Sequence, residues 1–223
     1  CSREAGGYVH WGGTTRNIID TGRNLLVREA HRNILKNLSI SIKKLSDLSI
    51  KYSEIPMLGR TMGQNAVPIS FGFKVAGWIE SLIRLDSKFK HAEASIFTLL
   101  FGGAVGAMHG FNGKGYELTQ KLASNLGFNN SIVPNRTSLE TSINYILALS
   151  FQGMILGKIA NEIYILMSQS INEISEKQTK GQVGSSTMPH KVNPVIILQV
   201  IEEAAILRGK ASTTIEAGMP LHE

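Results

Sequence analysis

Between Gly184 and Pro194 the sequence GSSTMPHKVNP gathers small and polar residues that suit anion binding. Glycine and serine leave backbone N–H groups available, Lys191 adds a fixed positive charge, and Asn193 can both donate and accept hydrogen bonds. Pro194 suits the first turn of a helix, whose positive end would lie close by. A serine among such donors is easier to deprotonate, because they favour its alkoxide. A flexible surface loop with a helix cap is the alternative that these residues leave open.

Helices must position this loop, because apolar residues recur at helical spacing through most of the chain. No stretch shows the alternation typical of strands, so the predicted fold class is all-α. The segment from Ser53 to Pro68, with its prolines and glycines, is predicted to be a connection. The predicted helices run over residues 15–52, 70–89, 91–108, 116–127, 137–175 and 194–216.

The two longest predicted helices, at 15–52 and 137–175, would each be about 50 Å or more in length. They are apolar around most of their circumference, so they need cover on several sides. A single bundle of this size gives too little cover, and we therefore predict a homo-oligomer that associates through the long helices.

The composition limits the classes of function. The chain has 223 residues, a net charge of +6 and 43% hydrophobic residues, which is enough for a buried core. Its single cysteine fits a reducing compartment, and we expect a cytoplasmic protein. The lysines and arginines are spread out, so we expect no nucleic-acid partner, although a basic balance suits a small polyanionic substrate.

Other kinds of site are not expected. No run of about 18 or more uncharged apolar residues indicates a membrane span. No His, Cys and Glu residues cluster at metal-ligand spacing, so neither a metal nor another cofactor is predicted. The sequence opens without methionine, and we expect it to be an excerpt of a longer polypeptide.

Three segments resemble the fumarase/aspartase superfamily. GSSTMPHKVNP resembles its signature loop, with the pattern Gly-Ser-Ser-x-Met-Pro-x-Lys-x-Asn. YVHWGGTTRNIIDTG, from Tyr8 to Gly22, resembles the first conserved region of the adenylosuccinate lyase and carboxymuconate cycloisomerase branch. GRTMGQNAVPISFGFKVAGW, from Gly59 to Trp78, resembles the second region, and the stretch 156–176 resembles the long central helix.

The resemblance implies a fold and an assembly. Residues 1–223 would form the central helical domain, with smaller helical domains before and after it. The protein would be a homotetramer in which each active site takes one conserved region from each of three subunits. The implied reaction is an anti β-elimination, or its reverse, on a small polycarboxylate, which needs a base, donors for the carboxylates and exclusion of water.

The resemblance also implies roles for residues of the signature loop. Ser185 matches the base, and the adjacent Ser186 is the alternative for that role. Lys191 and Asn193 match positions that hold the substrate carboxylate and its doubly charged aci form.

The other two regions contribute substrate-binding positions by the same resemblance. Thr14 and Thr15 stand where the family binds a carboxylate, and Gln64 matches a position that contacts substrate. His10 matches a histidine that binds substrate or transfers a proton, with a hydrogen-bonded structural histidine as the alternative. Arg16 departs from the family pattern, and would either bind an additional carboxylate or face solvent. Arg60 would lie beside the site or form a structural ion pair.

Two departures bear on the chemistry. Met62 stands where fumarases and adenylosuccinate lyases have a histidine that assists acid chemistry, and Leu198 stands where they have the paired glutamate. The carboxymuconate cycloisomerase branch also lacks this pair, and its leaving group is a carboxylate that needs little help from an acid. We therefore expect an enzyme most like that branch. The alternatives are an adenylosuccinate lyase-like C–N lyase with another acid, and a catalytically silent scaffold of the same fold.

Overall fold

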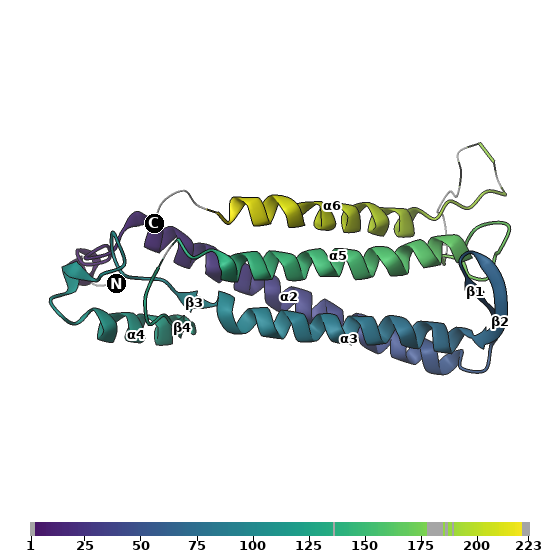
Figure 1. Ribbon diagram of the computed structural model, residues 1–223, viewed down its shortest axis with the longest axis horizontal. Coiled ribbons are helices and arrows are strands. Elements are labelled where there is room, and N and C mark those ends of the chain that lie inside the picture. Colours follow the sequence, from purple (N-terminus) through teal and green to yellow (C-terminus); the bar gives the residue numbers. More distant parts are fainter. Residues whose placement is uncertain (1–2, 136, 178–184, 186, 189, 220–223) are drawn as a thin grey trace. The chain divides into compact units, whose positions relative to one another are not determined.

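The structure is a computed structural model that describes residues 3–135, 137–177, 185, 187–188 and 190–219. Helices make up most of it, so the predicted all-α class is confirmed, with short strands added (Figure 1). The elements are α1 (Arg3–Gly6), α2 (Thr15–Lys51), β1 (Pro56–Thr61), β2 (Gln64–Ser70), α3 (Phe71–Ile96), β3 (Thr98–Leu99), η1 (His109–Phe111), α4 (Gly115–Leu126), β4 (Asn129–Asn130), α5 (Glu140–Leu166) and α6 (Val195–Ala217).

The chain divides into two compact units, and each has its own core. Unit 1 comprises Cys1–Asn37, Ser87–Tyr145 and Ile215–Glu223, and unit 2 comprises Leu38–Asp86 and Ile146–Thr214. The buried apolar residues of unit 1 include Phe89, Ala92, Ile96, Phe97, Leu99, Phe101, Phe111, Ala123, Phe128 and Tyr145. Those of unit 2 include Leu38, Val75, Trp78, Leu82, Leu85, Ala148, Ile159, Ala160, Leu166 and Ala204.

The core of unit 1 is aromatic and contains a buried histidine. His31 is 1% exposed, and its ring lies against those of Phe89, Phe97 and Tyr145. Its Nδ1 lies 3.2 Å from the hydroxyl of Tyr145. Burial, with a smaller contribution from the Glu93 carboxylate, raises the pKa of Tyr145 to about 12, so the phenol stays protonated and keeps this hydrogen bond at neutral pH.

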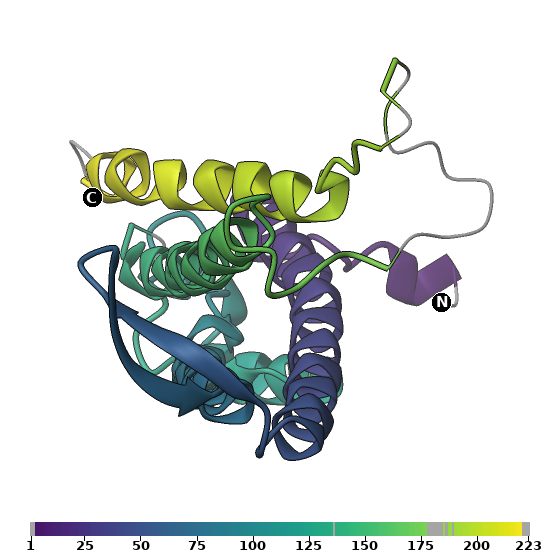
Figure 2. The ribbon, with the colours of Figure 1, turned by 90° about the vertical axis from the view of Figure 1, so that its right-hand side faces the viewer.

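In unit 2, α5 and α6 lie side by side (Figure 2). The hydroxyl of Ser150 donates to the carbonyl of Leu207 at 3.1 Å, and Arg208 donates to the carbonyl of Gly153 at 3.1 Å. A Cβ at Gly153 would come within 2.8 Å of the carbonyl oxygen of Ala204 on the facing helix. The lack of a side chain at this position therefore permits the close approach of the two helices.

The segment predicted as a connection is instead an antiparallel hairpin of β1 and β2, and the absence of strands was a wrong prediction. Thr61 pairs with Gln64, so Met62 and Gly63 form a two-residue turn. Both have positive φ, at 52° and 75°, as a type I′ turn requires. Methionine is not one of the residues that mark such a turn, so the residues of this segment do not predict a hairpin. Pro56 and Pro68 are tolerated because both strands of a two-stranded sheet are edges.

The predicted helix over 91–108 is also wrong. Helix α3 continues without a break to Ile96, and the chain then enters a glycine-rich loop. Gly103 and Gly106 have φ of 82° and 79°, in the left-handed region that a helix does not use. These glycines therefore shape the loop.

The remaining helices match their predictions to within one residue at one or both ends, except α5, which matches at neither. Helix α2 begins at Thr15 as predicted, and Gly127 in the left-handed conformation ends α4. Helix α5 stops at Leu166 rather than near residue 175, because the N–H of Glu173 turns back to the carbonyl of Leu166 at 3.0 Å. Asn172 has φ 52° at this turn.

Among the described residues, one helix, α5, is long enough and apolar enough to cross a membrane, judged by length and composition alone. Core helices of proteins that lie outside membranes meet the same criterion. Within unit 2, α5 packs against α6 and its Glu162 forms an ion pair with Lys74 of α3. We therefore attribute its apolar character to packing between helices.

Candidate functional site

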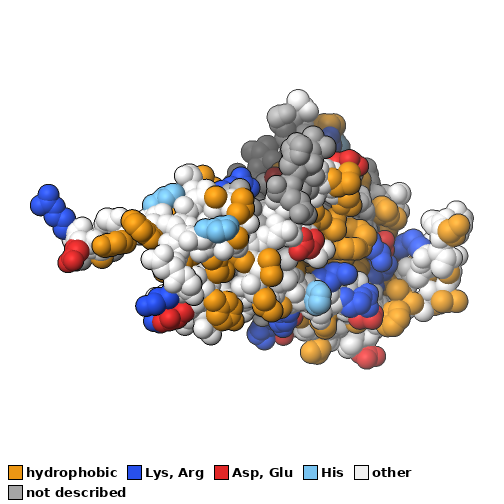
Figure 3. Space-filling model, turned by 60° about the vertical axis from the view of Figure 1, so that its left-hand side comes forward, with side chains coloured by type: hydrophobic (Ala, Val, Ile, Leu, Met, Phe, Trp, Pro, Cys, Tyr) orange, Lys and Arg blue, Asp and Glu red, His pale blue; other side chains and the backbone are white. Residues whose placement is uncertain are grey.

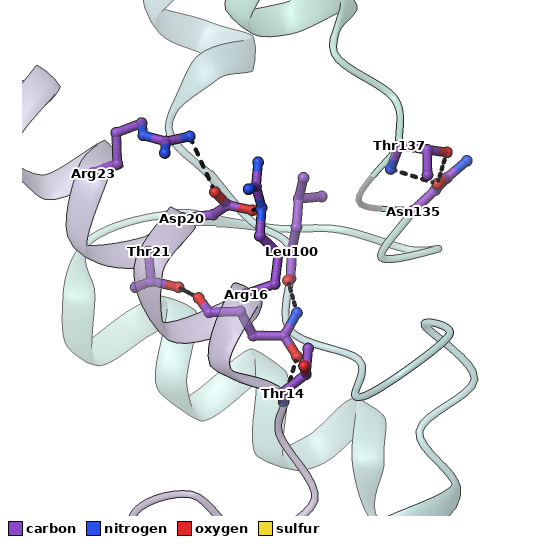
Figure 4. Close-up of polar contacts among 9 residues, drawn as sticks. Thr14, Arg16, Asp20, Thr21, Arg23, Leu100, Asn135 and Thr137 are labelled. Carbon is purple, nitrogen blue, oxygen red and sulfur yellow. Dashed lines mark hydrogen bonds and ion pairs between the residues drawn. The ribbon is translucent and has the colours of Figure 1, made fainter. Parts of the chain in front are cut away.

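The first motif lies in unit 1, where the start of α2 is fixed by a buried side chain. Asn17 is 3% exposed, and its Oδ1 accepts hydrogen bonds from the N–H groups of Thr14, at 3.1 Å, and Gly103, at 3.2 Å. Its Nδ2 donates to the carbonyl of Leu100 at 2.8 Å (Figure 4). Thr14 is the residue before the helix and Asn17 is three residues later, the spacing of a capping box. One amide thus joins the first turn of α2 to the glycine-rich loop.

The same loop is in backbone contact with the motif. A Cβ at Gly103 would lie 2.8 Å from the carbonyl oxygen of Gly12. Gly103 also has positive φ, so any other residue there would be strained and would push the two segments apart. The two loops therefore depend on each other for their shape.

The predicted substrate-binding threonines and His10 are accessible in unit 1. His10 and Thr15 are exposed, and Thr14 is half-buried. The backbone N–H of Thr14 is committed to Asn17. The structure thus leaves the hydroxyl groups of both threonines at the accessible end of α2, where a carboxylate would also meet the positive end of the helix dipole.

Arg16 lines a cavity in unit 1, and the carboxylate of Asp20 partly neutralises its positive charge. Its Nε donates to the carboxylate of Asp20 at 2.8 Å, and Arg23 donates to the other oxygen of Asp20 at 3.2 Å (Figure 4). The side chain of Arg16 is 50% exposed. The cavity has a volume of about 290 Å³, and its polar lining includes Arg16, Asp20, Arg23, Asn24, Ser95, Asn135, Ser138, Glu140, Thr141 and Ser142.

The second motif lies on the hairpin of unit 2. Gln64 is exposed at the start of β2, and the adjacent Met62 at the turn is 99% exposed. Arg60, on β1, forms a two-armed ion pair with Glu173, with N–O distances of 2.8 and 3.1 Å. The sequence left a structural ion pair as one of two interpretations of Arg60, and the structure contains this pair.

The ion pair shifts the pKa of both partners. The hydrogen bond from Arg60 is the main cause that lowers the pKa of Glu173, and the positive charges of Arg60 and Lys74 add to it. The same hydrogen bond raises the pKa of Arg60 above its already high value. Both shifts favour the charged form of the group concerned, and so favour the ion pair.

The described part of the signature loop surrounds Ser185 with backbone donors. The N–H groups of Met188 and Thr187 lie 3.2 and 3.4 Å from its Oγ, which accepts from both. The N–H of Lys191 in turn donates to the carbonyl of Met188 at 3.0 Å. Donors aimed at a serine oxygen favour its ionised form, so the geometry suits the predicted base. Ser186 lies outside the described residues.

The other predicted residues of this loop precede α6. Lys191 is exposed and Asn193 is half-buried, and the carbonyl of Asn193 accepts the N–H of Val195. Leu198, in the second turn of α6, is 45% exposed. Neither Leu198 nor Met62 carries a proton that it could donate, so unit 2 has no acid at either position.

The sequence-predicted residues therefore fall into two groups. His10, Thr14, Thr15 and Arg16 belong to unit 1, and Gln64, Ser185, Lys191 and Asn193 belong to unit 2. Within the ranges that the structure describes, no three His, Cys, Asp or Glu residues are arranged to hold a metal ion. Sequence reasoning missed Asn17 as a structural anchor, because a capping box is marked by glutamate or glutamine three residues after the threonine, and asparagine is not part of that signature.

Comparison with known proteins shows the family to which the chain belongs. A family model described as a lyase matches residues 2–208. The chain belongs to the lyase family of the fumarase/aspartase superfamily. It is similar to the N-acetyl-S-(2-succino)cysteine lyase of Enterococcus italicus, at 38% identity over 86% of this chain and 42% of that protein. It is also similar to the 3-carboxy-cis,cis-muconate cycloisomerase of Bradyrhizobium diazoefficiens, at 33% identity over 99% of this chain and 49% of that protein.

The fold is shared with a solved member of the superfamily. The 3-carboxy-cis,cis-muconate lactonizing enzyme of Pseudomonas putida superimposes with a TM-score of 0.92 at 32% identity, over 100% of this chain and 50% of that one. The chain thus spans about half the length of the relatives that it matches. The match to the lyase family confirms the predicted superfamily and the predicted family of enzymes.

Proposed function

We propose that the protein catalyses anti β-elimination, or the reverse addition, on a small polycarboxylate whose leaving group departs as an anion. The observation that carries the proposal is that Met62 and Leu198 together take the places of the histidine and glutamate that assist acid chemistry in other members of the superfamily. An amine must be protonated as it leaves, whereas a carboxylate or a thiolate is stable without a proton. A site without this acid pair fits the second kind of leaving group.

The proposed reaction begins at Ser185. Its oxygen, ionised with the help of backbone donors, takes a proton from the carbon next to a substrate carboxylate. The electron pair of that C–H bond first moves into the carboxylate, which becomes the doubly charged aci form. The pair then forms the double bond as the bond to the leaving group breaks, and the leaving group keeps the electron pair of that bond. Lys191 and Asn193 would stabilise the additional negative charge on the carboxylate.

The remaining predicted residues would bind the substrate. Thr14 and Thr15 would bind a second carboxylate at the start of α2, and Gln64 would contact the substrate from the hairpin. Arg16 would hold a further carboxylate and His10 would bind substrate or transfer a proton, each from unit 1. No cofactor or metal takes part in this scheme.

The first candidate substrate is 3-carboxy-cis,cis-muconate, in which the leaving group of the reverse reaction is a carboxylate of the same molecule. The similarity to the cycloisomerase of B. diazoefficiens and the fold match to the P. putida enzyme support it. The reaction would close or open a lactone without any acid at position 62.

A second candidate is a succinylated thiol, because the chain is 38% identical to an N-acetyl-S-(2-succino)cysteine lyase. Its leaving group would be a thiolate. Since thiols have a pKa of about 8.5, far below that of an alcohol or amide, a thiolate also leaves without an acid. Cleavage of the carbon–sulfur bond would release fumarate.

We also propose that the protein acts as a homotetramer with shared sites and that these residues form its central helical domain. Large apolar side chains are exposed on several elements, and Figure 3 shows one face on which they lie open between charged ones. On α5 and α6 they include Phe151, Met154, Tyr164, Ile165, Val195, Ile196, Leu198, Ile206 and Ile215. Association through these helices would cover them.

The test is an ultraviolet absorbance assay of the full-length protein with 3-carboxy-cis,cis-muconate and N-acetyl-S-(2-succino)cysteine in parallel, each repeated with Ser185→Ala. Turnover of either substrate that is lost in the variant supports the proposal and identifies the leaving group. A folded tetramer that turns over neither substrate would count against it and favour the silent-scaffold alternative.

A further inference from the structure

The segment Glu173–Glu176 follows α5 and connects three elements of unit 2. It is attached to the end of α5 by the hydrogen bond from the N–H of Glu173 to the carbonyl of Leu166, at 3.0 Å. Its two carboxylates point to different partners, one on the hairpin and one at the start of α6. We call these four residues the strut.

Glu173 connects the strut to the hairpin. Its carboxylate receives both arms of Arg60, and a third contact from Arg60 reaches the carbonyl of Leu58 at 3.3 Å. The side chains of Arg60 and Glu173 are only 21% and 25% exposed, so the pair is partly shielded from solvent. Figure 1 shows the hairpin beside the chain that follows α5. Arg60 pairs with Asn65, next to the Thr61–Gln64 pair that closes the turn, so the ion pair holds the hairpin close to its tip, which carries Met62 and Gln64.

Glu176 connects the strut to α6. Its carboxylate accepts the N–H groups of Ile196, at 3.3 Å, and Ile197, at 2.8 Å. These belong to the first turn of the helix, where the N–H groups have no partner within the helix. Pro194, the residue before the helix, has no side-chain oxygen with which to cap them. A carboxylate 20 and 21 residues earlier in the chain therefore caps the helix and complements its dipole.

We propose that Glu173 and Glu176 are positioning residues for the proposed reaction, and that the strut sets the hairpin and the start of α6 relative to each other. The proposal rests on the proposed function, because it assigns substrate contacts to Gln64, Lys191 and Asn193. Lys191 and Asn193 stand only a few residues before the capped N–H groups. Displacing the start of α6 would displace both residues from the carboxylate that they stabilise.

The alternative is that the strut only stabilises the fold. Measurements of kcat and KM distinguish this structural role from the positioning role. A positioning role predicts a fall in kcat that exceeds any change in KM, since misplacement of about 1 Å can cost about 100-fold in rate. A purely structural role predicts a lower melting temperature and unchanged kcat for the protein that remains folded.

The experiment compares Glu176→Ala, Glu176→Gln and Glu173→Gln in the full-length protein. We expect kcat to fall by about 10-fold or more in Glu176→Ala, in keeping with such misplacement. Glu176→Gln should retain part of the kcat that Glu176→Ala loses, because the amide oxygen of glutamine can still accept one N–H. The matched controls are Glu117→Gln, which breaks an ion pair with Lys121 on α4, and Glu162→Gln, which breaks the pair with Lys74. Both should retain wild-type kcat.

Hydrogen exchange gives a readout that does not depend on activity. The amide protons of Ile196 and Ile197 should lose protection in Glu176→Ala and keep it in both controls. Loss of protection with kcat within twofold of wild type would overturn the positioning role. If the wild-type protein is inactive on every substrate, the proposed function is overturned and the positioning role with it. The hydrogen-exchange result would still test, independently of activity, whether Glu176 caps α6.

Discussion

The motif regions of the two units are held in different ways. In unit 1 a single neutral amide, Asn17, is almost fully buried and ties the helix start to a loop through three hydrogen bonds. In unit 2 Met62 and Gln64 are exposed, and two carboxylates hold the neighbouring backbone: Glu173 pairs with Arg60 close to the hairpin turn, and Glu176 caps the first turn of α6. Buried neutral bonds give a rigid geometry that is insensitive to salt, whereas partly exposed charged contacts weaken with ionic strength and with acid.

The largest expected effect is on catalysis in unit 2. Ser185→Ala should lower kcat by about 10²–10⁴-fold, the usual contribution of a general base, with little change in stability. Steady-state kinetics with whichever candidate substrate is turned over would measure it. Ser212→Ala, at an exposed serine of α6 outside both the proposed site and the strut, is the control. Equal rates in the two variants would remove Ser185 from the mechanism.

The largest expected effect on stability is in unit 1. Asn17→Ala should lower the free energy of unfolding by about 2–4 kcal/mol, because it leaves buried N–H and carbonyl groups without partners. Asn24→Ala, which removes one 3.3 Å bond to the carbonyl of Ile96, should cost about 1 kcal/mol or less. Chemical denaturation of both variants would measure the difference. Similar losses would show that unit 1 is not anchored at Asn17.

At the hairpin turn we expect a smaller change in the free energy of unfolding, and in the stabilising direction. Met62 has φ 52°, a conformation that costs a non-glycine residue roughly 1–2 kcal/mol, and its side chain is 99% exposed. Met62→Asn should therefore raise the free energy of unfolding by about 1 kcal/mol, because asparagine adopts this conformation more readily. Met154→Asn, on the exposed side of α5, should give no gain. A loss of stability at position 62 would mean that its thioether is already packed in the assembly.

The smallest effect concerns the ion pair of the strut. Because the pKa of Glu173 is lowered in the folded protein, its contribution to stability is fully present above its ordinary pKa of 4.5 and is lost as the pH falls through its lowered value. Glu173→Gln should therefore be slightly less stable than wild type at pH 7, and the difference should shrink below pH 4.5. Thermal unfolding at several pH values would measure it. A constant difference would mean that charge is not the cause.

Local signals in the sequence predicted much of the fold. Thr15, Gly127 and Pro194 mark helix ends by rules that involve only neighbouring residues, and the structure has these ends. The hairpin was missed because its turn uses Met62 rather than asparagine, so the decisive φ values have no local signature. Glu176 was missed because its partners lie 20 and 21 residues away, and only the fold brings them together. The assignment of roles to the site residues came from the resemblance, and these roles stay predictions.

The most direct test of the account compares two substrates that share the succinyl half and differ only in the leaving atom, sulfur in one and nitrogen in the other. The ratio of their kcat/KM values reports whether the site supplies a proton to the leaving group. Without an acid at positions 62 and 198, the sulfur compound should be cleaved at least about 100-fold faster, the lower range of what a general acid contributes. Equal rates, or faster cleavage of the nitrogen compound, would contradict the claim that the leaving group departs as an anion.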